Sequence, residues 1–238
     1  MTTEPSAGLS ETGALLRLQA WFSPAFPVGG FSYSHGLEAA LEAGWIGDLD
    51  GLVDWLASDL AEGTLRSEAI LFLRAHRETG AGDRAALAET AGLAAALRGS
   101  AELALESSQQ GSAFLATLRA VWPAPALDAL VALLAARGLP ASLAVAAGAA
   151  CAAHGIAAEQ GLACFLQGTL ANLVSAALRL GLLGQTDGQR ALARLEPAVA
   201  EAVAAALAAD PEDLGSAGLL VEIATLVHET QYSRLFRS

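Results

Sequence analysis

The chain has 238 residues, of which 54% are hydrophobic and 16% are charged. This apolar content excludes an intrinsically disordered chain, because enough surface can be buried to offset the entropy lost on folding. The net charge of −12 combines 25 acidic residues with 13 basic ones, all of them arginine. An acidic chain without a basic run would repel phosphate groups, so neither nucleic acid nor an anionic membrane is an expected partner.

The absence of lysine also excludes Schiff-base chemistry and the Walker-type phosphate loop, because both depend on a lysine amine. Cys151 and Cys164 have alanine neighbours and are interpreted as small buried hydrophobic residues, which suits a reducing compartment. The first residues, MTTEPSAGLSETG, lack the basic and apolar regions of a signal peptide. We therefore expect a cytoplasmic protein in which residues 1–10 are flexible.

Helical periodicity recurs along almost the whole chain, and the apolar content is mostly Ala and Leu, the best helix formers. Proline and glycine residues mark the breaks between helices. The pattern predicts helices at about 15–22, 34–43, 48–60, 65–77, 85–97, 101–121, 127–136, 142–154, 157–183, 187–208 and 219–230. With short connections and no repeat of fixed period, the sequence predicts one all-α domain of about ten helices over residues 1–238.

The most apolar stretch, residues 162–183, is interrupted by Gln167, Asn172 and Arg179. In a membrane-spanning helix these polar groups would lie in hydrocarbon at a high energetic cost. The stretch is therefore predicted to be a buried core helix.

The sequence contains no recognisable catalytic or metal-binding motif. Cys151 and His154 share a helical face, but a zinc site needs four such ligands and the sequence offers no second pair. No glycine-rich phosphate loop and no Gly-x-Ser-x-Gly elbow is present. We therefore assign no catalytic residue, no metal ligand and no cofactor.

Two segments in the first half of the chain differ from the Ala-Leu background. Residues 23–38, SPAFPVGGFSYSHGLE, combine aromatic, proline and hydroxyl side chains, and could form either a buried loop or a contact surface. Residues 106–112, ESSQQGS, form a polar run within a helical pattern. This run is either a solvated face or a polar helix–helix contact, since polar groups are costly to bury without partners.

Two more such segments lie in the second half. In residues 184–190, GQTDGQR, either Thr186 or Asp187 could cap a helix, but the clustered Gln and Arg residues favour a polar patch for a partner. Residues 228–238, HETQYSRLFRS, place aromatic and arginine side chains on an acidic chain. Such a tail either orders on a partner or docks on its own body.

These four segments, in this order, resemble the UreF family of urease accessory proteins. The resemblance rests on the SPxxPVGxFSYSxGLE entry, the QxGS patch, the LVSAAxRL…GQTDGQR block and the HETQYSRLFRS tail. It implies an all-α homodimer that binds the accessory protein UreD (also called UreH). That pair recruits the GTPase UreG and acts on apo-urease, which supports GTP-dependent nickel insertion. GTP hydrolysis then belongs to UreG, whose activity the chain could regulate. The sequence departs from the family pattern at Leu226-Val227 and at residues 139–148.

The resemblance also implies site residues. The tail, residues 231–238, and the 15–22 region correspond to the surface that contacts UreD. Less directly, four polar residues correspond to the dimer or UreG surface. The resulting candidates are Tyr232, Ser233, Arg234, Leu235, Phe236 and Arg237 for UreD, and Arg179, Gln185, Asp187 and Arg190 for the second surface.

Two alternatives to this adaptor stay open. One is a nickel-binding metallochaperone that acts directly on the metal through His35, His154, His228 or Cys151. The other is an uncharacterised helical enzyme, supported only by the general capacity of helical pockets to hold substrates.

Overall fold

The computed structural model describes residues 9–238, so most of the segment expected to be flexible lies outside the described residues. Ser10 is described, and it caps the first helix, because its hydroxyl accepts a hydrogen bond from the Gly13 N–H at 3.1 Å. Residues 9–238 contain eleven α-helices, one 3₁₀ turn and no strand. The predicted all-α fold is confirmed.

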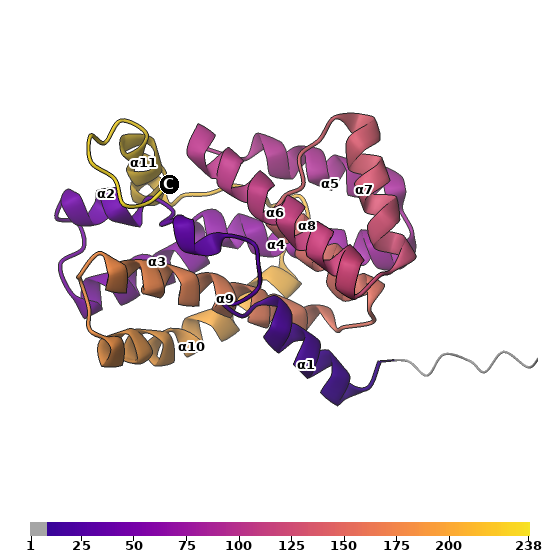
Figure 1. Ribbon diagram of the computed structural model, residues 1–238, viewed down its shortest axis with the longest axis horizontal. Helices are drawn as coiled ribbons and strands as arrows, with labels where there is room; N and C mark the ends of the chain where they lie inside the picture. The colour runs from indigo at the N-terminus through magenta and orange to yellow at the C-terminus, as the bar shows by residue number, and fades with distance from the viewer. Residues whose placement is uncertain (1–8) are drawn as a thin grey trace, which may run out of the picture.

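The helices follow one another with short connections (Figure 1). Their bounds are α1 Glu11–Trp21, η1 Gly30–Ser32, α2 Leu37–Glu42, α3 Leu49–Glu62, α4 Thr64–Ala81, α5 Arg84–Ala96, α6 Ala101–Val121, α7 Pro125–Arg137, α8 Leu143–Ala153, α9 Ala158–Arg179, α10 Gln185–Ala208 and α11 Leu219–His228.

The most extensive helix pair is α4 with α8, at the centre of the body. Helix α8 is made of small residues, and its Gly148 lies directly against the backbone of α4. A Cβ atom on Gly148 would lie 2.1 Å from the carbonyl oxygen of Phe72. The Ala-rich sequence of α8 is therefore explained by close backbone packing, which larger side chains would prevent.

Helix α9 is the apolar helix that the sequence predicts to be buried. It packs against α4, α8 and α10, and Leu162, Leu166 and Leu170 are completely buried along it. Its length and composition would also allow it to cross a membrane, and half of the relevant window is buried inside the body. Core helices of globular proteins pass the same test, and the packing of α9 is that of a core helix.

Several helix starts differ from the sequence expectation, and α1 begins at Glu11 instead of residue 15. Helix α10 begins at Gln185 with Gly184 at the N-cap, so neither Thr186 nor Asp187 caps it as expected. Helix α2 begins later than expected, because His35 and Gly36 adopt positive φ angles of 56° and 78°. Gly36 is required there, since a Cβ atom would lie 2.9 Å from the backbone nitrogen of Thr225 in α11.

The polar run at residues 106–112 is not a simple solvated face. Gln110 and Gly111 are buried within α6, and the Gln110 amide donates to the Glu106 carboxylate at 3.1 Å. That hydrogen bond lies within α6. The run meets other segments at Gly111, whose Cβ position lies 2.0 Å from the Ala141 carbonyl oxygen just before α8, and at Gln109, whose side-chain oxygen accepts from the Tyr33 hydroxyl at 2.5 Å. The run is therefore packed against neighbouring segments, as in the second of the two interpretations.

Candidate functional site

The tail folds back after α11 and ends beside the loop that precedes α2 (Figure 1). Its backbone is hydrogen-bonded there: the Arg237 N–H donates to the Ser32 carbonyl at 2.9 Å, and the Ser34 N–H donates to the Ser238 carbonyl at 2.8 Å. Of the two hypotheses for this segment, the structure has the tail docked on its own body.

Phe236 is the side chain that fixes the tail in place. Only 4% of its surface is exposed, and the guanidinium of Arg179 lies over its ring, 4.4 Å from the centroid. Arg179 also donates to the carbonyl of Phe31, and partial burial lowers its pKa. Arg179 therefore joins the end of α9 to the tail and to the loop before α2.

Glu38, in the first turn of α2, receives the tail backbone. One carboxylate oxygen accepts from the Leu235 N–H at 2.7 Å, and the other accepts from the Phe236 N–H at 2.9 Å. The second oxygen also lies 3.2 Å from Nε2 of His228. Such hydrogen bonds to an ionised acceptor are among the strong ones in proteins, so Glu38 is the main polar anchor of the tail.

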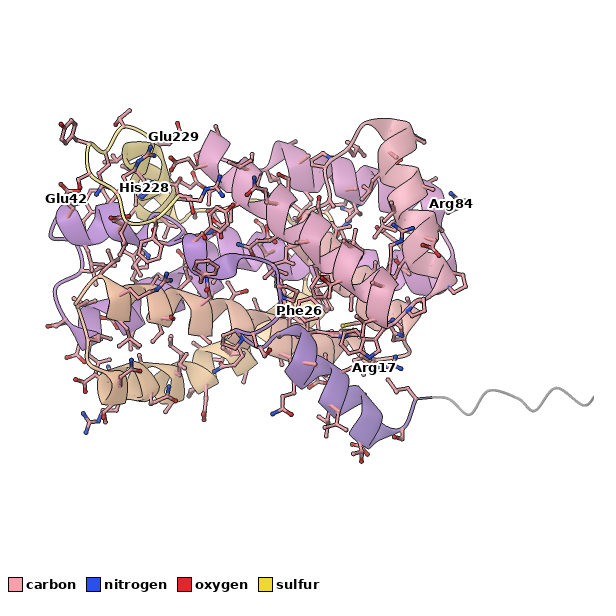
Figure 2. The ribbon with its side chains drawn as sticks, viewed as in Figure 1. Arg17, Phe26, Glu42, Arg84, His228 and Glu229 are labelled. Carbon is pink, nitrogen blue, oxygen red and sulfur yellow. The ribbon has the colours of Figure 1, made fainter. Side chains whose placement is uncertain are left out.

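His228 ends α11 on the side that faces α2 (Figure 2). Its imidazole is completely buried between two carboxylates, since Nδ1 lies 2.6 Å from Glu102 on α6 while Nε2 faces Glu38. The other oxygen of Glu102 accepts from the guanidinium of Arg234. We call Glu38, Glu102, His228 and Arg234 the anchor cluster.

A second buried imidazole lies under the end of the tail. Nε2 of His35 lies 2.8 Å from the Thr64 hydroxyl, and Nδ1 lies 3.7 Å from the Glu106 carboxylate, which accepts from the Ser238 hydroxyl at 2.6 Å. Burial alone would lower the pKa of His35, but the hydrogen bond and charge of Glu106, together with the charges of Asp59 and Glu68, raise it overall.

Helix α11 exposes most of its large aliphatic side chains. Its buried face consists of Val221, Ala224, Thr225 and His228, whereas its large aliphatic side chains are exposed. We call these exposed residues the outer face: Leu219, Leu220, Ile223, Leu226 and Val227.

The tail that follows α11 also exposes large side chains. Tyr232 is fully exposed and Leu235 is 63% exposed. Residues 219–238 contain two glutamates and two arginines, so these charges cancel within the segment, whereas the whole chain carries −12. Contiguous exposed apolar residues on a monomer mark an interaction site.

The other predicted site residues lie in two separate regions of the structure. Ser233, Arg234 and Arg237 are exposed on the tail, whereas Phe236 is buried under Arg179 and can be contacted only if the tail lifts. The remaining residues of the second set lie apart from the tail, in the first turns of α10. There Gln185 is exposed, and Asp187 pairs with Arg190 at 2.6 Å.

The 15–22 region, which the family resemblance pairs with the tail, is not beside it. Helix α1 lies below the body in Figure 1, whereas α11 and the tail lie at the upper left. Leu15 and Leu16 are exposed on α1, while Leu18 and Trp21 are buried against the body. A partner that contacted both α1 and the tail would have to extend across the molecule.

The candidate nickel ligands do not lie together, and each is held in its own surroundings. His154 lies 2.6 Å from the Arg17 guanidinium, and burial and the arginine charge lower its pKa. Cys151 is completely buried, which raises the pKa of its thiol. Residues 9–238 contain no group of three or more His, Cys, Asp or Glu side chains that could hold a metal ion.

Sequence reasoning missed Glu38, Glu102 and His228 as a group that positions the tail. The tail itself stood out, but nothing local indicated that residues 190 positions apart, such as Glu38 and His228, would meet. The outer face could have been found, because five large aliphatic residues recur at helical spacing opposite Ala224 and Thr225.

Comparison of the sequence with known proteins shows the family of the chain. The sequence model of the UreF family matches residues 46–196. The chain belongs to the UreF family. A urease accessory protein UreF from Bradyrhizobium diazoefficiens is 49% identical over 228 residues, which cover 96% of this chain and 93% of that protein. One from Xanthobacter autotrophicus is 48% identical over 225 residues, covering 94% and 91% of the two chains, and one from Methylorubrum populi is 49% identical over 224 residues, covering 94% and 98%. UreF membership confirms the resemblance drawn from the four segments.

Proposed function

We propose that this UreF-family chain is a non-catalytic, cytoplasmic adaptor in urease maturation. It binds UreD (UreH) and UreG, acts with them on apo-urease, and supports GTP-dependent nickel insertion. The names of its relatives support the role in urease maturation. The surface formed by the tail and the outer face of α11 is the site of partner contact.

One observation carries this proposal: large apolar side chains are exposed on a tail that buried groups hold in place. Glu38 and Phe236 fix the backbone, while Tyr232 and Leu235 face outward. A pre-ordered surface binds more tightly than a disordered one, because less conformational entropy is lost on association. Aromatic and arginine residues are also enriched at the cores of interfaces.

The polar patch at the start of α10 is our candidate for the second contact, which joins either a second copy of the chain or UreG. Arg190 is paired with Asp187 only at the surface, so its guanidinium can exchange that partner at little cost. The homodimer expected from the family resemblance belongs to the same proposal. Any regulation of the UreG GTPase would act through these contacts, since no phosphate-binding motif is present in the sequence.

The test is co-expression of the chain with its cognate UreD, followed by size-exclusion chromatography with light scattering. We would compare the full chain with Leu235→Asp, which places a charge in the proposed interface, and with Leu207→Asp near the end of α10. Leu207 is a matched control, because it is also a large exposed aliphatic residue, at 45% exposure, on a different part of the surface.

The expected result is a stable complex that survives Leu207→Asp and is lost with Leu235→Asp. Loss of the complex with both variants would indicate a general effect of added charge. Equal binding by both would move the UreD contact away from the tail. No complex with the unmodified chain would overturn the adaptor role toward UreD.

A further inference from the structure

A cavity of about 140 Å³ lies among the segment that follows α1, helix α6 and helix α9. Two of the four segments that stand out in the sequence line this cavity, and the proposed function assigns no partner to either. Residues 23–38 contribute Phe26, Phe31 and His35, and residues 106–112 contribute Glu106, Ser107 and Gln110. Phe31 is exposed, so the cavity can be reached from the surface at this loop. A cavity of roughly 150 Å³ is large enough to bind benzene, so there is room here for one aromatic ring.

One part of the lining is aromatic. Phe22 stacks on Phe114 with ring centroids 6.1 Å apart, and Phe26 lies 5.2 Å from the same Phe114 ring. Phe165 meets Phe22 edge to face at 6.0 Å. Figure 2 shows Phe26 on the loop that follows α1. These separations are typical of aromatic pairs, so a further ring in the cavity would be bound by the same kind of contact.

The other part of the lining is polar and contains hydrogen-bond acceptors that lack a donor. Gln110 is 7% exposed, and its amide nitrogen donates to Glu106 at 3.1 Å, which leaves its oxygen as an acceptor. The amide nitrogen of Asn172 donates in the same way to the Gly30 carbonyl at 2.9 Å. Within residues 9–238 neither amide oxygen accepts a hydrogen bond, and neither is fully enclosed. Both oxygens are therefore available to a bound molecule.

The charged groups of the lining favour a ligand that donates hydrogen bonds. The carboxylates of Glu68 and Glu106 line the cavity together with one guanidinium, that of Arg98. Arg98 pairs with Glu68, and both side chains of this pair are 10% exposed. The imidazole of His35 is already held by Thr64 and Glu106. A ligand carboxylate would add a third negative charge to this partly buried place, whereas an N–H donor would meet free acceptors.

We propose that this cavity is a binding site for a small molecule that joins an aromatic ring to an N–H donor group, such as an amidine or a protonated amine. The ring lies against Phe22 and Phe114, and the N–H groups donate to the free oxygens of Gln110 and Asn172. The site goes beyond the proposed function, since it requires no contact with UreD or UreG. A bound molecule would hold residues 23–31 against α6 and α9, because all three line the cavity.

The test is isothermal titration calorimetry of the full chain with three probes of similar size: benzamidine, benzoate and toluene. Benzamidine presents N–H donors on its ring, benzoate replaces them with a carboxylate, and toluene keeps only the apolar part. We expect benzamidine to bind with a Kd of about 1 mM or lower, and at least about tenfold more tightly than the other two probes.

Variants on α6 show whether benzamidine occupies the cavity. Ser107→Leu places a larger side chain in the lining and should weaken benzamidine binding at least about tenfold. Ser108→Leu is the matched control, because Ser108 is also half-buried but lies outside the lining; its affinity should be unchanged. Gln110→Leu removes one acceptor and should weaken the binding of benzamidine but not of toluene. Thermal unfolding checks that each variant is folded, and the two serine variants decide the question if Gln110→Leu does not fold.

Three results would overturn the inference. No binding of benzamidine up to about 10 mM would mean that the cavity holds water alone. Equal binding of benzoate would show that the lining does not select for hydrogen-bond donors. Benzamidine binding that is unchanged in Ser107→Leu would place the molecule elsewhere on this acidic chain. The measurements use the chain alone, so their outcome is independent of whether UreD or UreG binds.

Discussion

Removing the Phe236 ring should weaken the docking of the tail without lowering the stability of the body. Phe236 is 4% exposed and lies under the Arg179 guanidinium. Burying a phenylalanine side chain contributes roughly 1.5–3 kcal/mol, and a cation–π contact adds about 0.5–1 kcal/mol. Phe236→Ala should therefore weaken docking by roughly 2–4 kcal/mol, which is about a 30- to 1,000-fold change in the docking equilibrium.

The assay compares this variant with Tyr232→Ala by hydrogen exchange, thermal unfolding and UreD affinity. Phe236→Ala should deprotect the amides of the tail and weaken UreD binding, while the melting temperature of the body stays within a few degrees, because a docked end segment can open locally. Tyr232 is fully exposed, so Tyr232→Ala should leave the exchange unchanged and weaken UreD binding by about tenfold through lost contact.

The reasoning would be refuted if Phe236→Ala exposed the tail amides without changing the affinity for UreD. Docking would then be unnecessary for recognition. If Phe236→Ala instead unfolded the body, the tail would be part of the cooperative core rather than a separate docked segment.

Three further predictions follow from the packing and the titrating groups. Gly148→Ala should lower the melting temperature by about 4–8 °C, because the added methyl group pushes α8 away from α4 at a net cost of roughly 2 kcal/mol. Gly92→Ala is the control: the space around its Cβ position is open, so this variant should raise the melting temperature slightly. In the native protein, Cys151 should resist alkylation far longer than half-buried Cys164, and both should react at equal rates in denaturant; fast native labelling of Cys151 would contradict its burial. The pKa of His35 is raised in the folded protein, so protonated His35 stabilises the fold. This contribution to the free energy of unfolding is complete below the unfolded pKa of about 6.5 and is lost as the pH rises through the higher folded value. Urea unfolding of His35→Gln should therefore depend less on pH than that of the unmodified chain.

The sequence by itself determined the helical class of this protein and most of its helix positions. Alanine and leucine favour helices through local backbone and rotamer entropy, and each α-helical hydrogen bond joins residues only four apart. Caps such as Asp48, whose carboxylate accepts from the Gly51 N–H at 2.9 Å, are local in the same way. The composition and motifs of the tail likewise identified it as a partner-binding candidate.

Only the tertiary structure decided how that tail is held. Docking depends on contacts of Glu38, Glu102 and Arg179 with residues that are distant in the chain. The local sequence around each of these residues does not predict those contacts. The same holds for the helix starts: Gly36 lies where the backbone of α11 approaches, and this delays α2. Long-range polar contacts form only after helix packing brings the groups together in a place that excludes water, where each charge must find a partner. For that reason the anchor cluster, unlike the helices, could not be predicted from local pattern.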